Sequence, residues 1–449
     1  MRRPRRRAQT DAMDLDELVF HPWVAQGPRQ VPTFVGGAGS HVVDEYGRRY
    51  LDFSSQLVFA NLGHQHPRIV EAIKAQADRL CTLAPSHASD VRGEAARLIV
   101  GVAPEGLGHV LFTTSGTEAI EHAVRMARLA TGRPKVLAAY RSYHGSTTTS
   151  IHLTGDPRRW ASDTGAAGVV HFFGPFPYRS AFGSSTPEEE CERALDHLEQ
   201  VILLEGPSTV AALVLESVTG SSGVIVPPPG YLRGVRELCT RHGIVYIADE
   251  VLVGFGRTGA WFAVDHDEVA PDLLAFAKGV NSGYVPLGGV LVGERIFEAF
   301  TERPYPAGLT YSGHPLACAA AVGALRAMHE ERTVESAARL GNSVLGPALA
   351  KLAEGHPSVG DVRGIGALWT IELVRDRRSK EPLVPTGAAG EANAPMAAFV
   401  RACRDRDLLT LVLGNRIHVA PPLNIGDADV ATGVEVIDEA LTEADAFLG

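Results

Sequence analysis

The sequence predicts an α/β fold in which a mostly parallel sheet has helices on both faces, followed by a C-terminal α+β domain. Short apolar, β-rich runs alternate with helical patterns through the middle of the chain, which is typical of parallel strands joined by helices. Residues 211–215 are apolar at every position, as expected of a strand buried on both sides. At 449 residues the chain exceeds one ordinary domain. We expect an N-terminal segment (1–60), a large domain (61–315) and a C-terminal domain (316–449).

The N-terminal segment is predicted to contain a β-hairpin, with strands at residues 41–46 and 49–53 around Gly47. Roughly the first 12 residues are expected to be disordered. The large domain is predicted to have helices at residues 117–130 and 231–242. Its six expected strands are residues 109–113, 135–140, 169–173, 211–216, 244–249 and 273–277.

The C-terminal domain begins with two long helical patterns, at residues 316–329 and 333–354. Residues 364–373 are predicted to form a strand. A stretch rich in Gly, Ala and Pro, residues 384–395, is expected to be a loop, and residues 396–406 a helix.

Charge and composition exclude several classes of protein. The net charge is −10 although five of the first seven residues are arginine, so the body of the chain is acidic and unlike a nucleic-acid-binding domain. The basic start is interpreted as a short disordered tail or as a targeting or nucleic-acid tag, but not as a secretory signal, because acidic residues follow it. No apolar run is long enough to span a bilayer. We expect neither nucleic acid nor a membrane as a partner.

The five cysteines are scattered and lack the spacing of metal ligands, and the histidines form no paired zinc motif. No metal is therefore expected. An odd number of scattered thiols fits a reduced, cytoplasmic protein.

Lysine is scarce in this chain, and one lysine has unusual surroundings. Lys278 directly follows the apolar residues 273–277 and precedes Gly279, whereas the other four lysines lie in polar stretches. Burial favours the neutral, nucleophilic amine, and lysine can form an imine with an aldehyde where arginine cannot. The alternative is a lysine whose stem packs on apolar surface while its head reaches water.

Three further groups follow predicted strands, at the edge of an open α/β sheet where ligands bind. The turn at residues 115–117 opens a helix and suits a phosphate, or is an ordinary N-cap. Tyr143 could stack on a flat ring or pack in the core. Asp249 could meet a protonated pyridine nitrogen or form a salt bridge at the strand end. Together with Lys278, these groups offer the contacts that pyridoxal 5′-phosphate needs for its phosphate, ring face, ring nitrogen and aldehyde.

The order of these motifs resembles the class III, or ω-type, aminotransferases, which are fold type I pyridoxal-phosphate enzymes. The resemblance runs from residues 61–64 to residues 420–423, and it implies the fold type I architecture and a transaminase. The matching motifs are SGTEA (115–119), YHG (143–145), Glu216, DEV (249–251), FAKG (276–279) and TYSGHP (310–315).

The resemblance also implies roles for single residues. Lys278 resembles the lysine that forms the Schiff base, and Asp249 resembles the partner of the pyridinium nitrogen, which makes these two the catalytic residues. Thr310 resembles a residue that reaches the phosphate in the neighbouring subunit, which implies a homodimer with shared active sites and leaves a tetramer open. The positions that match cofactor contacts are Ser115, Gly116, Thr117, Tyr143, His144, Glu216, Asp249, Val251, Lys278 and Thr310.

The implied reaction is transamination with ping-pong kinetics, in which Lys278 carries the proton. The amino group would pass from an amine or ω-amino acid donor to a keto acid acceptor, with pyruvate favoured because residues 219–220 and 227–230 are most similar to taurine–pyruvate and other ω-amino acid–pyruvate enzymes. The alternatives are another reaction on the same fold (aminomutase, racemase, decarboxylase or phospholyase) and a non-catalytic homologue that binds the cofactor.

The chain departs from the family pattern where the substrate would bind. Many members carry an arginine where this chain has Leu411. Arg416 could take over its role of gripping a carboxylate, or could be a surface arginine. Trp23, Val58 and Phe59 resemble residues that line the pocket. The expected substrate-binding residues are therefore Trp23, Val58, Phe59 and Arg416.

Overall fold

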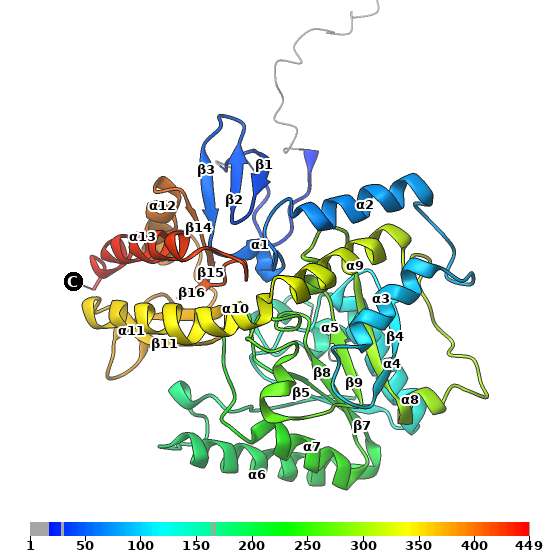
Figure 1. Ribbon diagram of the computed structural model, residues 1–449. Coiled ribbons are helices and arrows are strands. Elements are labelled where there is room, and N and C mark those ends of the chain that lie inside the picture. Colours follow the sequence, from blue (N-terminus) through cyan, green and yellow to red (C-terminus); the bar gives the residue numbers. More distant parts are fainter. Residues whose placement is uncertain (1–17, 28–30, 163–164, 166–167, 449) are drawn as a thin grey trace, which may run out of the picture.

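The central sheet has seven strands, and it confirms the predicted α/β fold. The computed structural model describes residues 18–27, 31–162, 165 and 168–448 (Figure 1). The strand order is β4-β10-β9-β8-β7-β5-β6, and within this sheet only β10 runs antiparallel to its neighbours. All six expected strands are present, whereas β10 was not predicted. The bounds are β4 (Leu107–Thr113), β5 (Lys135–Ala139), β6 (Val169–Phe172), β7 (Val210–Glu216), β8 (Val245–Asp249), β9 (Leu273–Phe276) and β10 (Gly288–Gly293).

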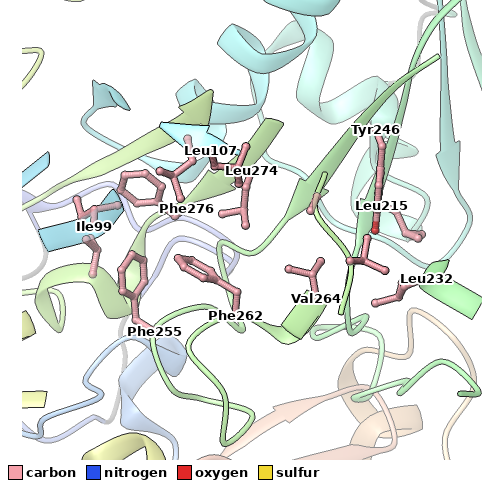
Figure 2. Close-up of a cluster of buried hydrophobic side chains, with 14 of the residues drawn as sticks. Ile99, Leu107, Leu215, Leu232, Tyr246, Phe255, Phe262, Val264, Leu274 and Phe276 are labelled. Carbon is pink, nitrogen blue, oxygen red and sulfur yellow. The ribbon is translucent and has the colours of Figure 1, made fainter. Parts of the chain in front are cut away.

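Alternate side chains of the central strands enter two apolar cores on opposite faces of the sheet. Leu215, Tyr246 and Leu274 lie in one core together with Phe255 and Phe262 (Figure 2). On each of these strands the neighbouring residues, such as Val214, Ile247 and Ala275, point to the opposite face and enter the other core. The first core also receives side chains from α2 (Pro67–Arg79), α3 (Asp90–Val100), α6 (Pro187–Glu205), α7 (Tyr231–His242) and α9 (Pro315–Glu330), and the second from α4 (Gly116–Thr131), α5 (Thr148–Leu153) and α8 (Glu294–Glu298).

The predicted N-terminal hairpin is present and belongs to a small four-stranded sheet. Its strands are β1 (Phe34–Ala38), β2 (His41–Asp44), β3 (Arg49–Asp52) and β14 (Leu408–Leu409), the last of which pairs in parallel with β3. The arginine-rich start lies outside the described residues. No helix within the described ranges is long and apolar enough to cross a membrane. The domain boundaries at residues 60 and 315 stay predictions.

The C-terminal part corrects two predictions. Residues 364–373 are not one strand, because they hold the end of β11, a turn at Gly366 and much of β12. A Cβ on Gly366 (φ +55) would lie 2.3 Å from the carbonyl carbon of Thr258, so the turn requires glycine. The helix expected at residues 333–354 is interrupted by the π-helical segment Leu340–Leu345. The elements here are α10 (Thr333–Arg339), α11 (Gly346–Gly355), β11 (Val359–Ile365), β12 (Leu368–Asp376), β13 (Glu381–Pro382), α12 (Ala394–Asp405), β15 (Leu411–Leu413), β16 (Arg416–Val419) and α13 (Asp427–Asp445).

Candidate active site

Three parallel strands bring the central residues of the site together. Glu216 ends β7 and is in register with Asp249, which ends β8. Asp249 is in register with Ala275 of β9, and Lys278 opens a 3-10 turn (Lys278–Asn281) directly after that strand. Because the carboxyl ends of parallel strands meet at one edge of a sheet, the two carboxylates and the amine share one place.

The surroundings of Lys278 favour its neutral amine. Burial lowers the pKa of Lys278; Asp249 and Glu216 oppose this effect, whereas the charge of Arg158 adds to it. The Lys278 backbone has φ +43, a left-handed conformation that is uncommon for a residue with a side chain and that clusters at functional sites. A buried lysine in this state is a stronger nucleophile than a solvated one.

Close packing around Gly279 explains why the FAKG motif ends in glycine. A Cβ at this position would lie 2.4 Å from Asn61 Nδ2 and 3.0 Å from the carbonyl oxygen of Gly254. The Asn61 amide donates to the carbonyl oxygen of Phe255 at 2.9 Å. The chain after Lys278 is therefore pressed against the Asn61 side chain, and this contact fixes the position of the lysine.

Asp249 is a buried carboxylate with a fixed orientation. It accepts hydrogen bonds from His144 Nδ1 at 2.7 Å and from the Val251 N–H at 3.0 Å. Burial disfavours the charged imidazole, but the hydrogen bond and the charge of Asp249 outweigh burial and raise the pKa of His144. His144 Nε2 is buried and has no hydrogen-bond partner among the described residues. The partner of Asp249 at this strand end is therefore the His144 imidazole, which forms an ion pair with the carboxylate when it is protonated.

Glu216 connects two neighbouring loops. Its carboxylate accepts hydrogen bonds from the backbone N–H of Tyr143 and of Gly220, both at 2.8 Å. Burial, aided by the charge of Asp249, raises the pKa of Glu216 to about 7. Glu216 therefore holds the backbone of Tyr143 at the edge of the sheet.

The start of α4 provides an anion-binding surface at the same edge. Ser115 is the N-cap of α4, and its Oγ accepts a hydrogen bond from the Glu118 N–H at 3.2 Å. The Ser115 hydroxyl therefore acts as an ordinary N-cap. The first-turn N–H groups and the positive end of a 16-residue helix still favour an anion here. A Cβ on Gly116 would lie 2.5 Å from Val251 Cγ1, and a Cβ on Gly145 would lie 2.4 Å from Thr117 Oγ1. The three predicted motifs therefore pack directly against one another.

The residues expected to line the substrate pocket are near this edge. The exposed Trp23 ring lies edge-on to Tyr143, with a centroid separation of 6.1 Å. Val58 ends the short helix α1 (Ser55–Val58) and packs in a small apolar cluster that Leu411 also contacts. Phe59 is half-buried against Gly283, where a Cβ would meet its ring at 2.3 Å.

Two expected residues lie in other environments. Arg416 is not on the surface, because it is half-buried and donates to the carbonyl oxygens of Leu413 at 3.1 Å and Ser222 at 2.7 Å. Thr310 is exposed in the segment between α8 and α9, which Ser312 ties to the Phe112 carbonyl oxygen of β4 by a 2.8 Å hydrogen bond. Among the described residues, Thr310 forms no hydrogen bond or ion pair with Lys278, Asp249 or Glu216.

Sequence reasoning missed two arginines. The Arg158 guanidinium stacks 3.6 Å from the centre of the Tyr143 ring. Arg257 is fully buried and donates to the carbonyl oxygens of Ala367 and Pro421 and to the side chains of Ser55 and Asn61. The signals that could have found them are an arginine pair after Asp156 and a charged residue within the glycine-rich run at residues 254–259.

Comparison with known proteins agrees with this geometry. The family described as Aminotransferase class-III matches residues 24–441. The chain belongs to the class III aminotransferases. Members of this family depend on pyridoxal phosphate, so the predicted family, cofactor and aminotransferase activity are confirmed. The buried acceptor, the amine and the helix start at the sheet edge fit that cofactor.

The similarity to known aminotransferases extends over most of this chain and most of theirs. Putrescine–pyruvate aminotransferase of Pseudomonas aeruginosa is 34% identical over 90% of this chain and 88% of its own. Taurine–pyruvate aminotransferase of Rhodobacter capsulatus is 34% identical over 94% of this chain and 93% of its own. The crystal structure of taurine:2-oxoglutarate aminotransferase from Bifidobacterium kashiwanohense, in complex with pyridoxal phosphate and glutamate, superposes with a TM-score of 0.92, with 39% identity and 97% of both chains covered.

Proposed function

We propose that this aminotransferase moves an amino group from an amine or ω-amino acid to a keto acid, with pyruvate favoured, and that Lys278 bonds the cofactor. The observation that carries the proposal is the meeting of Lys278 and the His144-bound Asp249 at adjacent strand ends, beside the start of α4. An amine, a fixed carboxylate and an anion-binding helix start are thereby available in one place.

Asp249 is proposed to accept a hydrogen bond from the ring nitrogen and keep it protonated. When bound, pyridoxal phosphate supplies an aldehyde that reacts with amines and a ring that takes up the electron pair of a broken C–H bond. Asp249 can serve it because the His144 side chain and the Val251 N–H hold the carboxylate in one orientation.

Lys278 has two proposed tasks. Its amine bonds the aldehyde carbon at rest, and burial supports this task by lowering the pKa of Lys278. Once an incoming amine has displaced Lys278, the Nζ of Lys278 would take the proton from the substrate carbon as general base and then, as general acid, deliver it to the cofactor carbon that had held the lysine. Arginine could do neither.

The other cofactor contacts keep their proposed roles. Ser115, Gly116 and Thr117 would hold the phosphate at the start of α4. Val251 and Tyr143 would lie against opposite faces of the ring, and Glu216 near its hydroxyl side. His144 would act through Asp249.

We also propose a cytoplasmic homodimer. Thr310 lies exposed outside the cluster around Lys278, as a residue that serves a neighbouring subunit's phosphate would. All five cysteines are free, which fits a reducing compartment. Mixing a Lys278→Ala chain with a Thr310→Ala chain tests the shared site. A mixed dimer has one site free of both changes, so activity should appear on mixing; no gain would contradict sharing.

The substrate proposal rests on the pocket residues and on the names of similar proteins. Trp23, Val58 and Phe59 would give the pocket an apolar, aromatic wall. The relatives are named for putrescine, taurine, pyruvate and 2-oxoglutarate, so these compounds belong in the test.

A single-turnover experiment without acceptor tests the reaction. A transaminase releases one equivalent of oxidised, carbonyl-containing product per active site and then stops, because the amino group stays on the enzyme. Adding pyruvate should then release one equivalent of alanine. Continuous product formation without any acceptor would instead show an aminomutase, racemase, decarboxylase or phospholyase, and release of nothing with any donor would show a non-catalytic homologue.

A further inference from the structure

An arginine-rich cavity lies between residues 155–158 and 221–222 on one side and the β15–β16 turn on the other. Its volume is about 550 Å³, which is the size of a small-molecule site. Two carboxylates line it, Asp156 and Glu372, against four arginines (Arg141, Arg158, Arg179 and Arg416). This excess of positive charge attracts anions.

Three of these four arginines are already bonded to the protein. Arg158 forms an ion pair with Asp156. Arg416 donates to two backbone carbonyl oxygens, at 2.7 and 3.1 Å. Arg179 donates from its Nε to Glu372 at 2.7 Å. The charges or donors of these three side chains therefore have partners within the chain.

Arg141 is the exception. In the part of the chain that the structure describes, its half-buried guanidinium has no hydrogen bond and no ion pair. Burial lowers the pKa of Arg141, and the charge of Arg179 lowers it further, whereas Glu372 and Glu190 oppose this effect. Both carboxylates are occupied: Glu372 accepts from Arg179 and from Arg363 Nη2 at 2.8 Å, and Glu190 accepts from a backbone N–H and two hydroxyl groups.

The position of Arg141 is fixed by its backbone and by an aromatic ring. Its φ of +70, directly beyond β5, is uncommon for a residue with a side chain. Its N–H donates to the Gly155 carbonyl oxygen at 3.0 Å. The guanidinium carbon lies 5.1 Å from the centre of the buried Phe176 ring. A fixed, unpaired guanidinium loses little entropy when it binds an anion.

We propose that Arg141 and Arg179 form an anion site, which binds a carboxylate or phosphate group in this cavity. Arg179 contributes because its Nη2 is buried and has no hydrogen-bond partner among the described residues. Two guanidinium groups that repel each other are stabilised when an anion lies between them. The fork of donors on each arginine matches carboxylate and phosphate oxygens, to which it donates two parallel hydrogen bonds.

The anion site is separate from the residues that react. Besides burial, the pKa of Lys278 responds to Asp249, Glu216 and the charge of Arg158, and neither arginine of the anion site contributes. The bound acid group can belong to a free anion or to the far end of a long substrate, because both present the same oxygens. The inference goes beyond the proposed function and does not depend on it.

Calorimetry on the holoenzyme tests the site, with inorganic phosphate and glutarate as probes. Loss of a charged hydrogen-bond donor should weaken binding of both probes about 10- to 100-fold in Arg141→Gln and in Arg179→Gln. Arg141→Lys should recover part of the loss, because it keeps the charge but not the fork of donors. Arg141→Gln removes no hydrogen bond of the described chain, so it should fold, and phosphate should raise the melting temperature of the parent more than that of this variant.

The matched control is Arg241→Gln, which removes one positive charge from an exposed ion pair outside the cavity and should bind both probes as the parent does. A kinetic measurement identifies the source of the acid group. If the group belongs to a substrate, kcat/KM for 2-oxoglutarate divided by kcat/KM for pyruvate should fall in Arg141→Gln. If it belongs to a free anion, this ratio should stay the same.

The proposal is overturned if neither probe binds the parent, or if both bind Arg141→Gln and Arg179→Gln as tightly as the parent. It is equally overturned if binding weakens only in Arg158→Gln or Arg416→Gln, because the anion would then lie elsewhere in the cavity. Binding is measured without turnover. A parent that converts no donor would therefore refute the proposed function and leave this test unaffected.

Discussion

Gly279 has no room for a methyl group, so Gly279→Ala is expected to displace the lysine before it. The new Cβ would lie 2.4 Å from Asn61 Nδ2, where ordinary contacts begin near 3.4 Å, so about 1 Å must be gained by movement. Asn61 is itself fixed, because its side chain donates to the Phe255 carbonyl oxygen at 2.9 Å and accepts from Arg257 at 2.8 Å.

The cost follows from these contacts. Overpacking a closed site costs roughly 1–3 kcal/mol, and weakening a hydrogen bond to a charged donor costs about 1.5–3 kcal/mol. The two together reduce the free energy of unfolding by about 3–5 kcal/mol, and at about 2 cal/mol/K per residue this corresponds to a melting temperature about 3–5 °C lower.

The assay is thermal unfolding of the holoenzyme, combined with the dissociation constant of pyridoxal phosphate, which should rise because Lys278 is misplaced. Gly93→Ala is the matched control: Gly93 lies within α3, and its Cβ would meet nothing within 4 Å, so alanine should stabilise the helix by roughly 0.5–1 kcal/mol. If Gly279→Ala melts within 1 °C of the parent and binds the cofactor equally well, the argument for this contact is refuted.

Three further changes test other parts of the structure. His144→Phe removes the donor to Asp249 and should lower kcat/KM about 10- to 100-fold, with partial recovery in His144→Asn, whose amide can donate; equal activity of all three proteins would contradict this role. Burial raises the pKa of Glu250 to about 7, so the folded state binds more protons than the unfolded state between about pH 4.5 and 7, and the stability that this group contributes is lost as pH rises through that window. Glu250→Gln removes this loss, so the slope of its melting temperature against pH between about pH 4.5 and 7 should be less negative than the parent's; an unchanged slope would refute this. Arg257→Met leaves buried acceptors unpaired and should lower the urea midpoint by an amount equivalent to roughly 3–5 kcal/mol, whereas Arg241→Ala, which removes an exposed ion pair, should cost about 0–1 kcal/mol.

The sequence predicted the central sheet because burial on both sides leaves a clear pattern. Strand β7 is buried at all seven positions, and its first six residues form an uninterrupted apolar run that ends at Glu216. Strand β10 was missed because glycines begin and end it. Gly289 is required there, since a Cβ would lie 2.5 Å from Phe276 Cζ, but this reason exists only in three dimensions.

The sequence predicted those residues of the candidate site that lie at or just after the ends of strands. Asp249 ends β8 and Lys278 follows the end of the adjacent parallel strand β9, so their meeting follows from topology. Arg257 was not predictable in this way, because its partners Ala367 and Pro421 lie 110 and 164 residues further along the chain. Arg158 was also missed, since its position depends on Ser221 and on the Tyr143 ring.

The bond between Lys278 and the cofactor is the central claim, and the scarcity of lysine makes it directly measurable. Borohydride reduction of the holoenzyme should fix pyridoxal phosphate to the amine that holds it, and peptide mass analysis should find the added mass on Lys278. Lys74, Lys135, Lys351 and Lys380 are internal controls in the same digest. We expect about one modification per chain, on Lys278, and none in Lys278→Ala. Stoichiometric modification of any other lysine, or none at all in a protein that converts amines, would contradict the account.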